Sequence, residues 1–240
     1  DSYNKSDFIN SSVDVNSSIT GSNTGQLGVG QVNYGTGAAP VDRAIITINN
    51  NNVIDMSGNK STGILADFGD ITNTGAGSFI KVTGEESVGI YAANGSVTNN
   101  SGTINIGKNS QGLYVKNGSL IHNMVNGIVE STGEKAVGLF ADTVNTVIND
   151  GNINMTGENS IGIYTTGTNN ISVTNTGTVI TGNSLNAANP SMGIYSNSPD
   201  SITNTGTVIS GVNSVGIYSN NGTVTQDGAL NVGENGTGLY

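Results

Sequence analysis

Carboxylates, serines and one histidine are the side chains of this 240-residue chain that could do acid–base or nucleophilic chemistry. Cysteine is absent and His122 is the single histidine, so a histidine-assisted nucleophile has few possible parts. Several acids recur after short β-branched runs, with Lys108 among them: Glu85, Glu86, Glu134, Glu158 and Glu234. Such alternation is typical of an exposed corner with balanced charge, not of the carboxylate pair of a glycosidase. The sequence therefore predicts that the chain is not an enzyme.

Metal, cofactor and nucleic-acid sites are not predicted either. The chain contains no EF-hand loop and no run of the calcium-binding Gly-Gly-x-Gly-x-Asp type. Its net charge is −10, and its seven basic residues are scattered, which argues against nucleic acid or an anionic membrane as partner. No apolar run is long enough for a transmembrane helix, and no signal peptide is visible.

An internal repeat organises the chain. A glycine followed by Ile or Leu, and then in most copies by an aromatic residue, recurs at Gly63, Gly89, Gly112, Gly138, Gly162, Gly193, Gly216 and Gly238. The intervals are 26, 23, 26, 24, 31, 23 and 22 residues, and most contain three short β-branched runs. This spacing fits one coil of a β-solenoid with three strands. We predict an all-β, three-faced parallel β-helix (β-solenoid) of about eight coils over residues 44–240. Residues 1–43 are expected to form a degenerate first coil or an irregular segment, with Gly25-Gln26-Leu27 as its signature.

Strand alternation predicts which side chains face inwards. In Val88-Gly89-Ile90-Tyr91, the valine and isoleucine would fill the core and the tyrosine would point outwards. Parallel stacking then predicts an aromatic ladder of Tyr91, Tyr114, Phe140, Tyr164, Tyr195 and Tyr218. It also predicts an amide ladder at one corner, made of Asn73, Asn99, Asn123, Asn149, Asn175, Asn204 and Gln226. The glycines fit corners that need a positive φ.

The 31-residue interval contains the main candidate for a binding site. Extra residues lie at 183–191, and a smaller bulge lies at 166–170 in the same coil. Binding sites tend to lie on loops held by a rigid scaffold. The candidate contact residues are Asn183, Leu185, Asn186, Asn189 and Pro190. The aromatic ladder is a second candidate, because outward rings can bind a sugar or a protein, although they can equally stabilise the stack.

The repeated Val-Gly-Ile-Tyr signatures and Thr-Asn-Thr-Gly-Thr runs resemble the passenger domains of Gram-negative autotransporter adhesins, the fusobacterial type most of all. The resemblance covers residues 44–240, and it implies that the predicted parallel β-helix is right-handed. It implies type V secretion, display at the bacterial cell surface, and adhesion to host cells or to other bacteria through a surface protein or glycan. It also implies a C-terminal outer-membrane β-barrel in a longer parent chain, of which this chain would be a fragment. No family motif assigns individual binding residues.

The repeat is also compatible with three other functions. A stalk that projects a binding region located elsewhere would need only uniform coils. An ice-binding solenoid would need a flat face of outward threonines, for which Thr72, Thr98, Thr174, Thr203 and Thr225 are a series broken at Ile121 and Ile148. A polysaccharide-degrading β-helix would need a carboxylate cluster, and none is found in the sequence.

Overall fold

The computed structural model describes residues 11–31, 46–67, 69–74, 77–94 and 97–240. Regular structure in these residues consists of 27 strands and no helix. Accordingly, no helix among them could span a membrane.

The strands form three sheets. Sheet A contains β1 (Ser11–Val15), β4 (Ile46–Asn50), β7 (Asp70–Asn73), β10 (Val97–Asn100), β13 (Leu120–Asn123), β16 (Thr146–Asn149), β19 (Ser172–Asn175), β22 (Ser201–Asn204) and β25 (Thr223–Gln226). Sheet B contains β2 (Ile19–Gly21), β5 (Val53–Met56), β8 (Phe79–Val82), β11 (Thr103–Ile106), β14 (Ile128–Ser131), β17 (Asn152–Met155), β20 (Thr178–Thr181), β23 (Thr207–Ser210) and β26 (Ala229–Val232). Sheet C contains β3 (Leu27–Gln31), β6 (Thr62–Asp67), β9 (Val88–Ala93), β12 (Gln111–Lys116), β15 (Val137–Asp142), β18 (Ile161–Thr166), β21 (Met192–Ser196), β24 (Val215–Ser219) and β27 (Thr237–Leu239).

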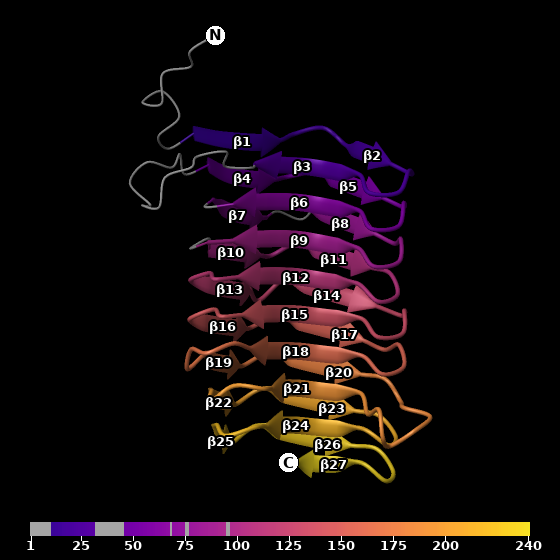
Figure 1. Ribbon diagram of the computed structural model, residues 1–240, viewed down its shortest axis with the longest axis vertical. Coiled ribbons are helices and arrows are strands. Elements are labelled where there is room, and N and C mark those ends of the chain that lie inside the picture. Colours follow the sequence, from indigo (N-terminus) through magenta and orange to yellow (C-terminus); the bar gives the residue numbers. More distant parts are fainter. Residues whose placement is uncertain (1–10, 32–45, 68, 75–76, 95–96) are drawn as a thin grey trace.

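Each strand pairs in parallel with the strand three positions along the chain, so successive coils stack as Figure 1 shows. This arrangement confirms the predicted three-faced parallel β-solenoid. Strands β1, β2 and β3 join the same sheets as the later coils. In β3, Leu27 lies opposite Thr62 and Val29 opposite Ile64. The signature glycine of this coil is therefore Gly28, and the predicted alignment on Gly25 is wrong by three residues.

The core contains stacked aliphatic side chains from all three sheets. Ile90 in sheet C, Ile104 in sheet B and Ile121 in sheet A are all 0 % exposed. The prediction for Ile90 is thus confirmed, but the one for Val88 is wrong, because Val88 is partly exposed and Gly89 is buried instead. A Cβ atom on Gly89 would lie 2.6 Å from Cγ2 of Ile104. Two consecutive residues therefore face inwards at the signature, and the first must lack a side chain.

Positive φ angles fall mostly on residues other than glycine, which overturns a second expectation. Among the described glycines, only Gly25 and Gly167 have positive φ. In the turns between sheets B and C this conformation is taken by Lys60, Glu86, Asn109, Lys135, Asn159, Asn213 and Asn235. The glycine at the start of each turn is needed for close stacking: a Cβ on Gly84 would lie 2.1 Å from the carbonyl oxygen of Gly58.

An amide ladder does run along one corner, with Asn100 in place of the predicted Asn99 and with Asn50 as an additional member. Its side chains are Asn50, Asn73, Asn100, Asn123, Asn149, Asn175, Asn204 and Gln226, joined by hydrogen bonds of 2.6–2.9 Å. The predicted Asn99 is not a member, because Thr98 lies opposite Ile71 and Asn99 opposite Thr72. A shift of one residue exchanges the two faces of a strand. Thr98 consequently points into the core, where its Oγ1 has no hydrogen-bond partner.

The outward column of sheet A does not favour ice binding. From Thr72 onwards it reads Thr72, Asn99, His122, Ile148, Thr174, Thr203 and Thr225. The threonines are interrupted in three consecutive coils, and Thr98 of the predicted series is buried. A continuous threonine face is therefore missing from this sheet.

Candidate functional site

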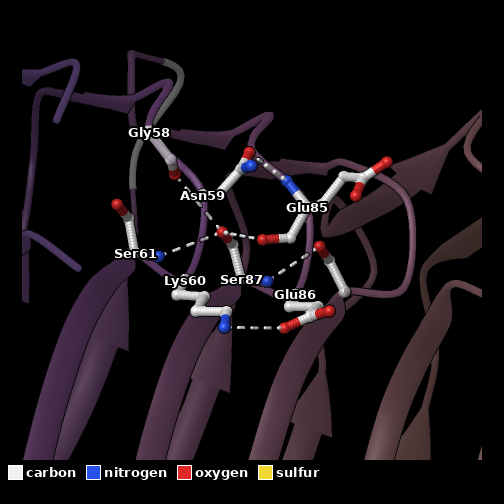
Figure 2. Close-up of polar contacts among 8 residues, drawn as sticks. Gly58, Asn59, Lys60, Ser61, Glu85, Glu86 and Ser87 are labelled. Carbon is white, nitrogen blue, oxygen red and sulfur yellow. Dashed lines mark hydrogen bonds and ion pairs between the residues drawn. The ribbon is translucent and has the colours of Figure 1, made fainter. Parts of the chain in front are cut away.

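The turn between sheets B and C is the part of each coil from which the inserted loop departs. In a regular coil it has four residues, as in Gly58-Asn59-Lys60-Ser61. Figure 2 shows how neighbouring turns interlock: Ser61 N donates to Ser87 Oγ at 3.0 Å, and Ser87 Oγ lies 3.4 Å from the Gly58 carbonyl oxygen. An ion pair of 3.5 Å between Lys60 and Glu86 crosses the outside of the same turns.

The turn serines form a second buried polar ladder, which the sequence analysis missed. Its members are Ser61, Ser87, Ser110, Ser160, Ser191 and Ser214, all at most 1 % exposed. Ala136 occupies the equivalent place in one coil. The available signal was a serine two residues before most signature glycines. The ladder fixes where each turn can begin and end.

The inserted segment 183–191 connects β20 to β21 and extends beyond the line of the other turns in Figure 1. Ser191 keeps the place of the turn serine, since its Oγ accepts from Ser160 N at 3.2 Å. Ser191 N in turn donates to Ser184 Oγ at 3.0 Å. Ser184 is 2 % exposed, and its Oγ lies 2.8 Å from both Asn159 Oδ1 and the Asn189 carbonyl oxygen. A buried hydroxyl therefore closes the base of the loop.

Coils on both sides hold the loop. From the preceding coil, Glu158 Oε1 accepts from Leu185 N at 3.1 Å. From the following coil, Val212 N donates to Asn183 Oδ1 at 2.8 Å, and Asn213 Nδ2 donates to the Ser184 carbonyl at 2.9 Å. The loop is thus built into the stack on both sides.

The predicted loop residues have different roles. Asn183 anchors the loop, and Asn186 Oδ1 accepts from Ala188 N at 2.9 Å within it. Leu185 is 86 % exposed and is therefore accessible to a partner. Asn189 and Pro190 line a pocket of about 450 Å³ together with Lys135, Asn159, Ala188 and Met192. Sequence analysis did not indicate Lys135 or Asn159, which lie on the two preceding coils.

The aromatic ladder forms as predicted and continues to Tyr240. Neighbouring ring centroids are 4.6–5.1 Å apart. From Tyr114 through Phe140 and Tyr164 to Tyr195 the rings are nearly parallel, with interplanar angles of 13°, 5° and 21°. Each inner ring is therefore covered on both faces by its neighbours and offers mainly its edge. A sugar needs a free aromatic face for stacking, so this geometry favours a structural role for the ladder.

Burial raises the pKa of Tyr114, and the charge of Asp142 and the neighbouring Tyr91 add to this effect. The pKa of Tyr195 is likewise raised, first by burial and then by Tyr164 and Tyr218. These tyrosines stay protonated at neutral pH, as expected for ladder members packed against one another.

Comparison with known proteins identifies no relative. No protein-family model, curated protein or solved structure matches this chain. The function of this chain must therefore be inferred from the geometry of the candidate site.

Several charged groups of the described residues form ion pairs at the turns between sheets B and C. Lys108 forms ion pairs with Glu134 and, at 3.9 Å, with Glu85, while Glu86 pairs with Lys60 instead. The hydrogen bond to Glu134, followed by its charge, raises the pKa of Lys108. This is the exposed, charge-balanced corner that the sequence indicates. No group of three or more potential metal ligands occurs among these residues.

His122 and Asp200 each belong to a small polar cluster. His122 Nε2 lies 2.8 Å from Asp150 Oδ2, and Thr176 Oγ1 donates to Asp150 Oδ1 at 2.6 Å. The Thr176 hydrogen bond, followed by that to His122, lowers the pKa of Asp150. Asp200 is 1 % exposed and accepts from Ile171 N at 3.0 Å, from Ser196 Oγ at 2.7 Å and from further hydroxyls. Asp200 thereby secures the bulge at 166–170, which we assign to the scaffold.

Proposed function

We propose that this chain is a surface-displayed adhesion module that presents the inserted loop 183–191 to host cells or to other bacteria. One observation carries the proposal. The two neighbouring coils form several hydrogen bonds with the inserted loop 183–191, although the other coils of the solenoid stack without such a loop. Every other described turn between sheets B and C has only four or five residues between its strands, against ten between β20 and β21. Binding sites commonly lie on loops that a rigid scaffold holds in place.

The proposed partner is a host-cell surface protein or glycan, or a surface component of another bacterium. The proposed setting is extracellular, at the surface of a Gram-negative cell, with the chain exported as part of an autotransporter passenger and anchored through an outer-membrane barrel. The repeated signatures that resemble autotransporter passengers support this setting, and a stack of parallel coils suits the projection of a binding loop away from a membrane.

The test is saturable binding of labelled chain to epithelial cells and to partner bacteria, with a loop-shortened variant beside it. Deletion of residues 185–190 combined with Ser184→Asn leaves Gly-Asn-Asn-Ser-Met-Gly, which matches the regular turn at 211–216. This variant should keep the fold because it restores the standard turn length with asparagine at the positive-φ position. We expect binding to be lost while the thermal transition is kept. Full binding by the variant would refute the proposal, and no binding by either protein would favour a stalk.

A further inference from the structure

We propose that the pocket under the inserted loop binds an acidic sugar residue, one that carries a carboxylate, within a surface glycan. The inference rests on the proposed adhesive function and specifies its ligand. The pocket lies between three coils: Lys135 and Asn159 come from consecutive turns, and Ala188, Asn189, Pro190 and Met192 come from the loop and the start of β21. Its volume of about 450 Å³ falls in the range of small-ligand sites, roughly 300–1,000 Å³.

Lys135 gives the pocket its charge preference. Lys60, Lys81, Lys108 and Lys116 each have a carboxylate oxygen within 4.0 Å, and among the described lysines Lys135 alone lacks one. The acids nearest to it in the turns have other partners. Glu134 is paired with Lys108, although the charge of Lys135 also contributes to its lowered pKa, and Glu158 accepts a hydrogen bond from Leu185 N. In a chain with a net charge of −10, an exposed lysine without an ion-pair partner in the lining of a pocket attracts an anion.

The rest of the lining fits a sugar ring. Asn159 Oδ1 lies against the Ser184 hydroxyl, which leaves its Nδ2 group to donate to a ligand. The side-chain amide of Asn189 adds a second neutral polar group. Ala188, Pro190 and Met192 supply an apolar wall. The lysine can bind a carboxylate, and the two amides can bind hydroxyl or acetamido groups. The apolar wall can pack against the C–H face of a pyranose ring.

The experiment measures binding of the whole 240-residue chain to soluble sugars by saturation-transfer NMR and calorimetry. The probes are the methyl glycosides of N-acetylneuraminic acid and glucuronic acid, the methyl ester of the first, and neutral methyl galactoside. The test variant is Lys135→Asn, which suits the positive φ of 56° at that position because Asn159 occupies the equivalent place with φ 55°. Lys60→Asn is the matched control, since Lys60 also has φ 56° but lies outside the pocket.

We expect the two acidic glycosides to bind, and the ester and the neutral sugar to bind at least tenfold more weakly. The Lys135→Asn variant should bind the acidic glycosides roughly tenfold more weakly than the parent chain, because one charge-assisted hydrogen bond is lost. Lys60→Asn should bind as the parent chain does. Equal affinity in Lys135→Asn, or no binding of either acidic glycoside, would overturn the inference. So would equal binding of an acidic peptide that also depends on Lys135. Loop-dependent cell binding without acidic-sugar binding would refute only the ligand class, whereas sugar binding without cell binding would refute the adhesive function.

Discussion

Replacing Asn100 by alanine should destabilise the solenoid strongly. Asn100 is 0 % exposed, accepts from Asn73 Nδ2 at 2.7 Å and donates to Asn123 Oδ1 at 2.8 Å. Its removal leaves one buried donor and one buried acceptor without their ladder partner, each at a cost of about 1–3 kcal/mol. Asn100→Ala should therefore lower the free energy of unfolding by about 2–6 kcal/mol if both groups stay unpaired.

Asn99→Ala is the matched control, because it removes the same amide from the neighbouring position. Asn99 is partly exposed and lies in the outward column, so its loss should change stability within about ±0.5 kcal/mol. The assay is urea unfolding followed by circular dichroism, with hydrogen exchange at the amides of β7, β10 and β13 to locate the damage. Greater destabilisation by Asn99→Ala than by Asn100→Ala would refute the register and with it the ladder.

Three further perturbations follow from the structure. Gly112→Ala should destabilise the solenoid by about 1–3 kcal/mol in thermal unfolding, because the new Cβ would lie 2.4 Å from Val129 Cγ1. Gly77→Ala is the control and should be tolerated, since the atom nearest to a Cβ there is 4.0 Å away. Phe140→Ala should lower stability to urea by about 1–3 kcal/mol, because two stacked ring pairs of about 0.5–1.5 kcal/mol each are lost. Asp150→Asn should destabilise at neutral pH, and the difference should shrink as pH falls below about 3.9. The lowered pKa of Asp150 means that its contribution is present above the unfolded value and is lost as pH falls through the folded pKa. Unfolding measured from neutral to acidic pH checks the last prediction, and a difference that grows on acidification would contradict it.

The sequence was sufficient to predict the coil and most of its ladders. A glycine, an aliphatic residue and an aromatic residue at a near-constant interval specify one strand per coil, and parallel stacking then brings Tyr91 beside Tyr114. Departures from the interval located the loop 183–191 for the same reason. These features depend on local pattern and on stacking alone.

The errors arise where local pattern leaves two options. Val97-Thr98-Asn99-Asn100 offers adjacent asparagines to the ladder, and only the paired neighbours decide that Asn100 faces inwards. Alternation along β9 also fails, because Gly89 has no side chain and can face the core beside Ile90. Lys135 and Asn159 were beyond reach for a different reason: they join the loop only when three coils are stacked.

Adhesion under flow tests the central claim most directly. Beads coated at equal density with the chain, or with the variant that lacks residues 185–190 and carries Ser184→Asn, are passed over epithelial monolayers and immobilised partner bacteria, and retained beads are counted. The proposed function predicts firm retention of beads with the parent chain on at least one surface, and retention at the level of uncoated beads for the variant. Equal retention of both kinds of bead would contradict the claim that the inserted loop carries adhesion.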